Sequence, residues 1–319
     1  MNELSKEAVS YVAVGEDGAG QRIDHYLARI LKGVPKSHIY RILRSGEIRV
    51  NGGRAGPDVR LVAGDRIRVP PIRTSPNRRS GSPAVGRVVL KLRILHEDDS
   101  LLAIEKPAGL AVHGGSGVAH GLIEQLRMAR PQDRFLELVH RLDRDTSGIL
   151  LVAKKRASLV ELHRMLREGE IDKRYLVLVR GRWRDDMRSV SVPLHRFATR
   201  DGERRVRVDD RGQASATVFR RHRAWPRHSP PLALLEAELK TGRTHQIRVH
   251  LAHIGFPIAG DDKYGDFDWN RQLSQEGLKR MFLHAHRLAF VHPIGRDSIE
   301  LTSPLPADLA GYVARVEGR

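Results

Sequence analysis

The amino-acid sequence predicts an α+β protein with two domains, a small N-terminal α/β module and a larger domain built on a largely antiparallel mixed sheet. After residue 88, short apolar runs with β character outnumber helical stretches, a pattern typical of α+β domains. Residues 73–87 are rich in Pro, Gly, Ser and Arg, which indicates a flexible basic linker. We therefore divide the chain into a tail (1–15), the small module (16–72), the linker (73–87) and the large domain (88–319).

The composition narrows the class of protein. The 319 residues carry 56 Lys and Arg against 38 Asp and Glu, and the net charge of +18 favours a polyanionic partner such as nucleic acid or an acidic membrane surface. No apolar run reaches the length of a membrane span, and residues 1–10 lack the apolar core of a signal peptide, so we expect a cytoplasmic protein that faces RNA or DNA. The absence of cysteine excludes disulfides, thiolate metal sites and a cysteine nucleophile.

In the small module, apolar residues at helical spacing predict a first helix over residues 23–31. A second helix is predicted to begin at Ser37, as its N-cap after Pro35, and to stop at Gly46. The alternating residues that follow predict short strands at 48–50 and 66–69.

The small module is strongly basic. Between Arg22 and Arg68 it holds eleven Lys or Arg against four Asp or Glu, a net charge of +7, and Arg41 and Arg44 share one face of the second helix. Two short helices followed by Gly-Glu-Ile-Arg-Val-Asn-Gly and Gly-Asp-Arg-Ile resemble the small RNA-binding domain named after ribosomal protein S4. The resemblance implies that Arg41 and Arg44 contact RNA; the alternative is a solvated helix face.

The large domain mixes strands with a few helices. The predicted strands are 101–105, 149–154, 174–180, 214–219, 232–239 and 285–291. The predicted helices are 119–129, 157–168 and 244–254.

The most informative stretch of this domain is the charged run His-Arg-Leu-Asp-Arg-Asp-Thr-Ser-Gly at residues 140–148. It lies between two apolar segments, and charges held between strands must be paired because an unpaired buried charge is very costly. The run therefore predicts a carboxylate held beside arginines at the edge of a sheet, with Thr146-Ser147-Gly148 forming the turn. The alternative is a solvated β-turn.

A second run, Thr-Gly-Arg-Thr-His-Gln-Ile-Arg-Val-His, spans residues 241–250. Thr244 is predicted to cap a helix that runs to Gly255, and the start of that helix is a natural anion site with Arg243 beside it. Arg248 lies one turn further on and either shares that site or is a surface cation. The histidines of this run miss the spacing of a zinc site, so no metal site is expected.

Two further segments do not indicate a function by themselves and are informative only together with the other motifs. Lys106-Pro107 opens a loop rich in Pro and Gly that lacks the ending of a nucleotide-binding P-loop. Tyr175 lies on a predicted strand and would be an ordinary sheet aromatic unless that strand passes near Asp143.

Together these motifs resemble the RluA family of pseudouridine synthases. The stretches at residues 140–148, 173–175 and 242–250 occur in the family's order and approximate spacing, and the Lys106-Pro107 loop and Leu283-His284-Ala285 agree as well. Residues 136–155 are especially similar to the RluC branch, which acts on bacterial large-subunit ribosomal RNA. The basic stretch at 200–213 is less similar to the family.

The resemblance implies that the protein isomerises uridine in RNA to pseudouridine without a cofactor. It further implies a monomer whose partner is the large-subunit ribosomal RNA or its precursor particle. Asp143 then matches the family's essential aspartate, acting as nucleophile or base, and Arg248 matches its cationic partner. Tyr175 matches the residue that stacks on the uracil and assists proton removal from C5, and Arg141 matches the arginine that enters the RNA when the base leaves its stack. Asp145 is the rival to Asp143, and the choice between them rests on the resemblance.

Other functions remain open from the sequence. A non-catalytic RNA-binding ribosome-assembly factor could keep the same fold, and a pseudouridine synthase could act on tRNA instead. A glycosidase that releases uracil would want a second carboxylate opposite the first.

Overall fold

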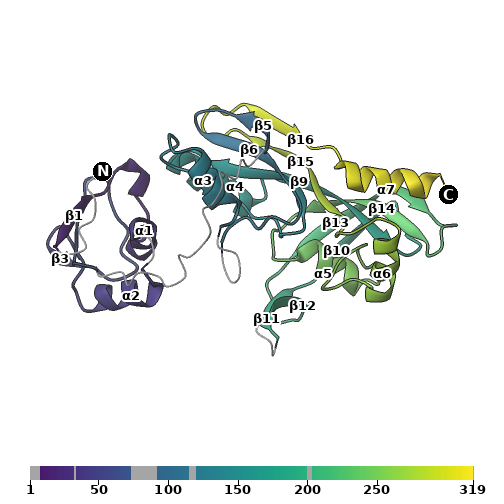
Figure 1. Ribbon diagram of the computed structural model, residues 1–319, viewed down its shortest axis with the longest axis horizontal. Helices are drawn as coiled ribbons and strands as arrows, with labels where there is room; N and C mark the ends of the chain where they lie inside the picture. Colours follow the sequence, from purple (N-terminus) through teal and green to yellow (C-terminus); the bar gives the residue numbers. More distant parts are fainter. Residues whose placement is uncertain (1–7, 32–33, 73–91, 115–119, 200–202, 319) are drawn as a thin grey trace. The chain divides into compact units, whose positions relative to one another are not determined.

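The computed structural model describes residues 8–31, 34–72, 92–114, 120–199 and 203–318. The chain divides into two compact units, residues 1–88 and 89–319, which are described separately (Figure 1). The predicted linker at 73–87 lies outside the described residues. Among the helices that are described, none has the length and apolar character needed to cross a membrane.

The first unit packs two helices against a four-stranded antiparallel sheet of order β1-β4-β2-β3. Apolar side chains from the helices and from β4 form one buried cluster, with Ile23, Ile42 and Ile67 fully enclosed. Its elements are β1 (Ser10–Ala13), η1 (Glu16–Gly18), α1 (Ile23–Ile30), α2 (Lys36–Arg44), β2 (Arg49–Val50), β3 (Gly53–Arg54) and β4 (Arg66–Val69).

The ends of α2 show which local signals decide a helix boundary. The helix begins at Lys36 with Pro35 as its N-cap, so the prediction of Ser37 as the N-cap is wrong. Pro35 has a fixed φ near −58°, which already sets the entry to the helix one step earlier. The helix ends at Arg44, and Gly46 reverses the chain at φ +74°, a conformation that favours glycine.

The second unit is built on a ten-stranded sheet with the main order β10-β13-β14-β9-β15-β8-β6-β5. Among the described strand pairs of this sheet, β15 with β8 is the one parallel pair, which confirms the predicted largely antiparallel mixed sheet. Its strands are β5 (Arg93–Glu97), β6 (Leu101–Lys106), β7 (Glu137–Leu138), β8 (Ser147–Ala153), β9 (Asp172–Arg180), β10 (Met187–Ser191), β13 (Ala216–Trp225), β14 (Leu232–Leu239), β15 (Leu283–Val291) and β16 (Ser298–Thr302).

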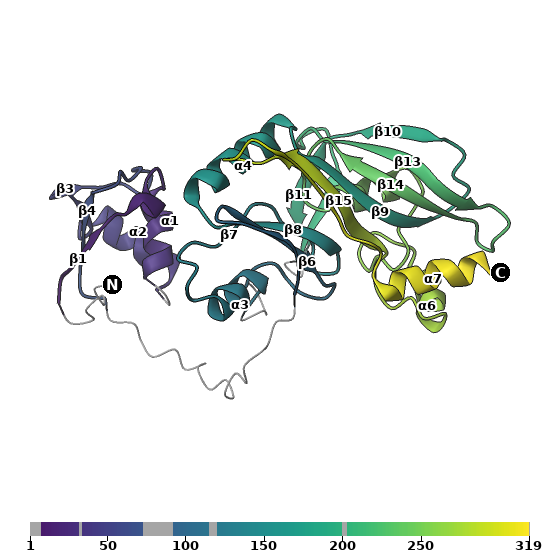
Figure 2. The same ribbon diagram turned by 90° about the horizontal axis from the view of Figure 1, so that it is seen from above.

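Helices cover both faces of this sheet, because alternate residues of its central strands are apolar on both sides. On β6, Leu102 and Ile104 pack with α3 and α5, whereas Leu101 and Ala103 pack with α4 on the opposite face. Figure 2 shows α3 and α4 on opposite sides of β6 and β8. Helices α6 and α7 cover a third apolar cluster over β9 and β14. The helices are α3 (Leu122–Ala129), α4 (Arg156–Glu168), α5 (Gln246–His253), α6 (Phe267–Gln275) and α7 (Ala307–Glu317).

β11 (Leu194–Ala198) and β12 (Arg204–Val208) form a separate two-stranded hairpin, and β12 lies in the stretch 200–213 that is less similar to the family. Leu194 and Val206 of the hairpin pack against Val249 of α5. The hairpin is therefore anchored on the helix that carries Arg248.

The turn after residue 142 differs from the one predicted. The Thr146 N–H donates to the Asp143 carbonyl oxygen at 3.2 Å, and β8 already begins at Ser147. The assignment of Thr146-Ser147-Gly148 to the turn is therefore wrong: the turn is Asp143–Thr146, and Ser147 and Gly148 belong to β8. Gly148 belongs to the parallel pairing with β15, where φ is +115° and an added Cβ would lie 2.2 Å from the Ala285 carbonyl oxygen.

Candidate active site

A buried lysine, Lys106, forms hydrogen bonds with the backbone of the loop that carries Asp143. The Lys106 ammonium donates to the carbonyl oxygens of Pro107, Leu110 and Arg144 at 2.8, 2.8 and 3.0 Å. Its side chain is fully enclosed, and burial lowers the pKa of Lys106 to about 8. The lysine of the Lys106-Pro107 loop thus ties that loop to the turn around Asp143.

Arg248 joins the Asp143 carboxylate to a second, buried carboxylate. Its Nη1 donates to Asp143 Oδ2 at 3.1 Å, and its Nε and Nη2 make a bidentate pair with Asp261 at 2.8 and 2.7 Å. The Arg248 side chain is 5% exposed, so the surface-cation alternative is wrong. Burial alone lowers the pKa of Arg248, but the hydrogen bonds and charges of Asp261 and Asp143 outweigh it and raise the pKa above its ordinary value.

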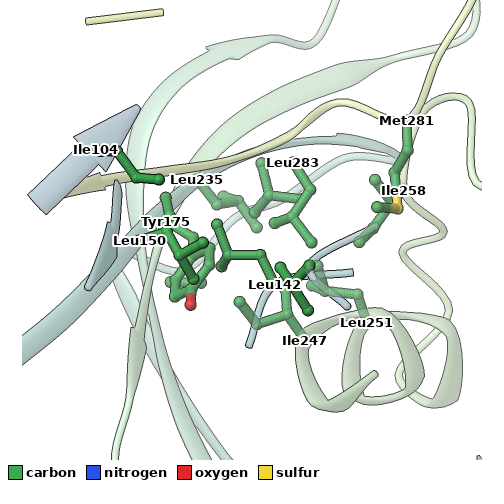
Figure 3. Close-up of a cluster of buried hydrophobic side chains, with 14 of the residues drawn as sticks. Ile104, Leu142, Leu150, Tyr175, Leu235, Ile247, Leu251, Ile258, Met281 and Leu283 are labelled. Atoms are coloured by element: carbon green, nitrogen blue, oxygen red, sulfur yellow. The ribbon is translucent and has the colours of Figure 1, made fainter. Parts of the chain in front are cut away.

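Tyr175 of β9 was expected to be functional only if its strand passes near Asp143, and the two residues line the same cavity. Its ring lies among aliphatic side chains that include Leu142 and Ile247, and Figure 3 shows it in that cluster. Burial first, and the charge of Asp143 second, raise the pKa of Tyr175. The phenol is therefore protonated at neutral pH.

Asp143, Tyr175 and Arg248 line one cavity of about 600 Å³. Arg141 and Arg243 line it as well, so the structure brings together five of the residues singled out from the sequence. Such a volume is in the range of small-ligand sites and accommodates a nucleoside.

The rival carboxylate is placed differently. Asp145 accepts from its neighbour Arg144 at 3.3 Å, and its side chain is 35% exposed against 19% for Asp143. Asp145 does not line the cavity. The geometry therefore separates two aspartates that lie two positions apart in the sequence.

The start of α5 is built differently from the prediction. The helix begins at Gln246 with His245 as its N-cap, so the prediction of Thr244 as the cap is wrong. The Gln246 side-chain oxygen accepts from the Arg243 N–H at 3.0 Å and from the Thr241 hydroxyl at 2.7 Å. The side-chain amide of Gln246 thus folds back on the turn that precedes the helix, and no side chain caps the helix at its N-cap residue.

The cavity is lined in part by exposed arginines. Arg141 is exposed, and among the described residues its guanidinium has no carboxylate partner. Arg243 uses its Nε on the Ala214 carbonyl oxygen at 3.1 Å, and the exposed Arg196 of β11 also lines the cavity. Sequence reasoning missed Arg196, because a short polar hairpin gives no periodic signal.

Four other contributions were also missed. Lys106 was noted only for its loop, His245 only for its spacing to His250, and Asp261 and Tyr264 were not noted at all. Within the parts of the chain that the structure describes, no group of three or more His, Cys, Asp or Glu side chains is arranged to hold a metal ion.

In the first unit, the two predicted RNA contacts are exposed. Arg41 lies 3.4 Å from Glu47 with 60% of its side chain exposed, and Arg44 lies one turn further along α2, also exposed. They are not part of the cavity, which is lined by residues of the second unit alone.

Comparisons with known proteins agree across almost the whole chain. The profile of the RNA pseudouridylate synthase family matches residues 100–253, and that of the S4 domain matches residues 21–67. The chain is 50% identical over 309 residues, 96% of this chain and 94% of the relative, to ribosomal large subunit pseudouridine synthase C of Pasteurella multocida (strain Pm70).

The protein of the same description from Escherichia coli (strain K12) is 50% identical over 306 residues, 95% of each chain. A solved structure of human RNA pseudouridylate synthase domain containing 4 superposes with a TM-score of 0.55 at 25% identity, covering 70% of this chain and 92% of that one. The chain described here belongs to the RNA pseudouridylate synthase family, with an S4 domain in its N-terminal unit.

Proposed function

We propose that this protein converts specific uridines of bacterial large-subunit ribosomal RNA to pseudouridine. The observation that carries the proposal is the placing of Asp143, Arg248 and Tyr175 around one cavity in a chain of this family. The relatives that are half identical over nearly the full length are described as large-subunit synthases, which supports the substrate.

The reaction breaks the N1–C1′ bond of uridine, turns the base and joins C5 to C1′, while the proton on C5 is lost and N1 gains one. No electrons or groups are exchanged with a donor, so we infer that the protein acts without a cofactor. We also infer that it acts as a monomer in the cytoplasm, where ribosomal RNA or its precursor particle is available.

Asp143 is the group we assign to the reacting carbon. Either proposed role, attack on C1′ or removal of a proton, requires an ionised carboxylate. The Arg248 guanidinium, held by Asp261 on its other side, donates from Nη1 to Asp143 Oδ2 at 3.1 Å. Arg248 is therefore a fixed counter-charge that does not have to be recruited when the RNA arrives.

Tyr175 presents a flat ring against which the uracil can stack. The raised pKa of its phenol makes it a poor proton acceptor at neutral pH, so the stacking role is better supported than the removal of the C5 proton. We therefore assign the removal of the C5 proton to the carboxylate of Asp143, which lines the same cavity.

The target uridine must leave its stack before C1′ and C5 can be reached. We assign Arg141, exposed at the cavity rim, to the space that the base vacates, and Arg243 to the flanking phosphates. Arg41 and Arg44 of the S4 domain then add phosphate contacts elsewhere on the RNA.

The test is Asp143→Asn, with Asp145→Asn as its matched control. Large-subunit RNA from cells that lack this protein is the substrate, and pseudouridine, free uracil and RNA affinity are measured. We expect Asp143→Asn to abolish product while affinity stays within a few-fold, and Asp145→Asn to retain activity.

Three outcomes would contradict the proposal. Full activity of Asp143→Asn would show that Asp143 is not the catalytic carboxylate. It would favour a non-catalytic RNA-binding protein, with the measured product formed by another enzyme in the preparation. Release of free uracil by the unmodified protein would indicate a glycosidase. Product formed in tRNA but not in large-subunit RNA would assign the other class of substrate.

A further inference from the structure

His245 occupies a backbone conformation that a non-glycine residue rarely adopts. Its φ is 54° and its ψ is 22°, in the left-handed region, at the start of α5. Such residues persist where the surroundings hold them, and they gather at functional sites. Here the conformation places an imidazole with 13% of its side chain exposed between Asp143 and Tyr264.

The partners of Tyr264 fix which ring nitrogen of His245 carries the proton. The Tyr264 hydroxyl oxygen accepts from the Val206 backbone N–H at 2.9 Å and lies 2.8 Å from His245 Nδ1. Burial raises the pKa of Tyr264, so its hydroxyl keeps a proton to donate. His245 Nδ1 lies within hydrogen-bond reach of that proton, and we assign Nδ1 as the nitrogen that accepts it.

The imidazole is neutral at pH 7. Burial lowers the pKa of His245, and Arg248 and Lys263 act in the same direction, whereas Asp143 and Asp261 oppose them. A neutral ring with an unprotonated Nδ1 carries its proton on Nε2, and Nε2 is the atom that faces Asp143 Oδ1, at 3.8 Å.

The two oxygens of Asp143 thus face two different nitrogen donors. Oδ2 accepts from Arg248 Nη1 at 3.1 Å, and Oδ1 faces the Nε2–H of His245. A separation of 3.8 Å is longer than a hydrogen bond, and such contacts often shorten when substrate fills a site.

We propose that His245 is a positioning residue for Asp143, a role that rests on the function assigned to that carboxylate above. The Nε2–H of His245 donates to Asp143 Oδ1 and so fixes the rotation of the carboxylate. That rotation decides which carboxylate oxygen faces the ribose carbon. Tyr264 sets the tautomer of His245 and also lies under Arg248, whose guanidinium carbon is 5.1 Å from the ring centroid.

The anchor of this chain of contacts is the β11–β12 hairpin. Val206 of β12 supplies the N–H that holds the Tyr264 hydroxyl, and Glu203 pairs with both Arg205 and Lys263. The hairpin is thereby docked on the loop that contains Tyr264. Its contribution at Asp143 is one of orientation, transmitted through Tyr264 and His245.

A spectroscopic test needs no activity measurement. Long-range proton–nitrogen correlation spectra of the full chain, labelled at histidine nitrogen, report the tautomer of each imidazole. The His245 signals are identified by their loss in His245→Gln. We expect a neutral Nε2–H ring at pH 7 that becomes a mixture of tautomers in Tyr264→Phe. An Nδ1–H ring or a cationic ring at pH 7 would overturn the proposal.

A kinetic test compares three variants that keep similar side-chain size. His245→Met removes the donor, His245→Gln keeps an N–H donor near the position of Nε2, and Tyr264→Phe removes the hydroxyl alone. We expect His245→Met to lower kcat by about 10- to 100-fold with KM within about three-fold, as for loss of an orienting partner. His245→Gln should recover most of that loss, and Tyr264→Phe should cost about ten-fold.

The outcomes distinguish this proposal from the one on which it rests. If Asp143→Asn is inactive and His245→Met keeps its kcat, the positioning role is wrong and the assigned carboxylate stands. Equal losses in His245→Met and His245→Gln would also count against the positioning role, since the donor would not matter. Activity in Asp143→Asn would contradict the function assigned to that carboxylate.

Discussion

The active-site cavity and the basic helix of the S4 domain use arginine in opposite ways. Arg248 is 5% exposed and contacts the carboxylates of Asp143, Asp261 and Asp262, whereas Arg44 is exposed on α2. A buried guanidinium loses its hydration and is stable only while its partners remain, so its position is fixed. An exposed one keeps its hydration, contributes little to folding and is available to phosphate. The buried arginine holds carboxylates in place, and the exposed ones are those to which we assign RNA affinity.

The largest expected difference comes from removing the cation itself. Arg248→Met leaves the Asp261 carboxylate, whose side chain is 1% exposed, without its main partner. We expect the free energy of unfolding to fall by about 3–5 kcal/mol, as when one half of a buried ion pair is removed, and product formation to be lost. Denaturant unfolding measures the first effect.

The matched control for that experiment is Arg44→Met, which removes an exposed arginine. We expect it to change the free energy of unfolding by less than about 0.5 kcal/mol. Equal stability losses in the two variants would show that burial of the arginine is not what distinguishes the two regions.

Buried and exposed cations should also differ in how the free energy of unfolding depends on pH. The folded chain releases the Lys106 proton near pH 8, whereas the unfolded chain keeps it to about 10.5, so unfolding takes up a proton between these values. Relative to Lys106→Met, the wild-type free energy of unfolding should therefore rise between pH 8 and 10.5, by up to about 3 kcal/mol. Lys155→Met, at an exposed position, is the control, and a flat difference for Lys106 would contradict its burial as a charged group.

The smallest expected effects belong to the exposed arginines. Arg41→Gln combined with Arg44→Gln should weaken RNA binding several-fold and reduce the slope of log affinity against log salt by about 1 to 2. The kcat at saturating RNA and the free energy of unfolding should stay close to wild type. Arg271→Gln, which removes an exposed arginine of α6, is the control for general loss of charge.

An unchanged salt slope in the double variant would show that this face of α2 does not contact phosphate. Removal of residues 1–80 should enlarge the same effect, with weaker RNA binding and a flatter salt dependence.

Much of the fold could be predicted because its central elements have strong periodic patterns. The strands β6, β8, β9 and β14 and the helices α3 and α4 lie close to their predicted positions. Helix α7 was missed although Leu309, Tyr312, Val313 and Val316 follow helical spacing, so its signal was present in the sequence. The β11–β12 hairpin gives little signal, since its second strand, Arg-Arg-Val-Arg-Val, buries a single valine fully.

The residues of the candidate site were harder to predict from the sequence than the fold. Local spacing could not choose between Asp143 and Asp145, and the choice depended on resemblance to a family. The structure separates them by their partners: Arg248 for one and Arg144 for the other. Asp261 and Tyr264 could not be predicted, because their contacts with α5 are made across loops that no local pattern describes.

The parallel pairing of β8 with β15 has a consequence for how the protein comes into being. Ser147, at the end of the turn that bears Asp143, lies 2.9 Å from Nδ1 of His284, a residue 137 positions later in the chain. Gly148 meets the Ala285 backbone at the same place. While the ribosome is still making this protein, the emerging chain holds Asp143 without the strand that frames it. We therefore expect a chain that ends before residue 285 to be inactive on RNA, because the surroundings of Asp143 are incomplete.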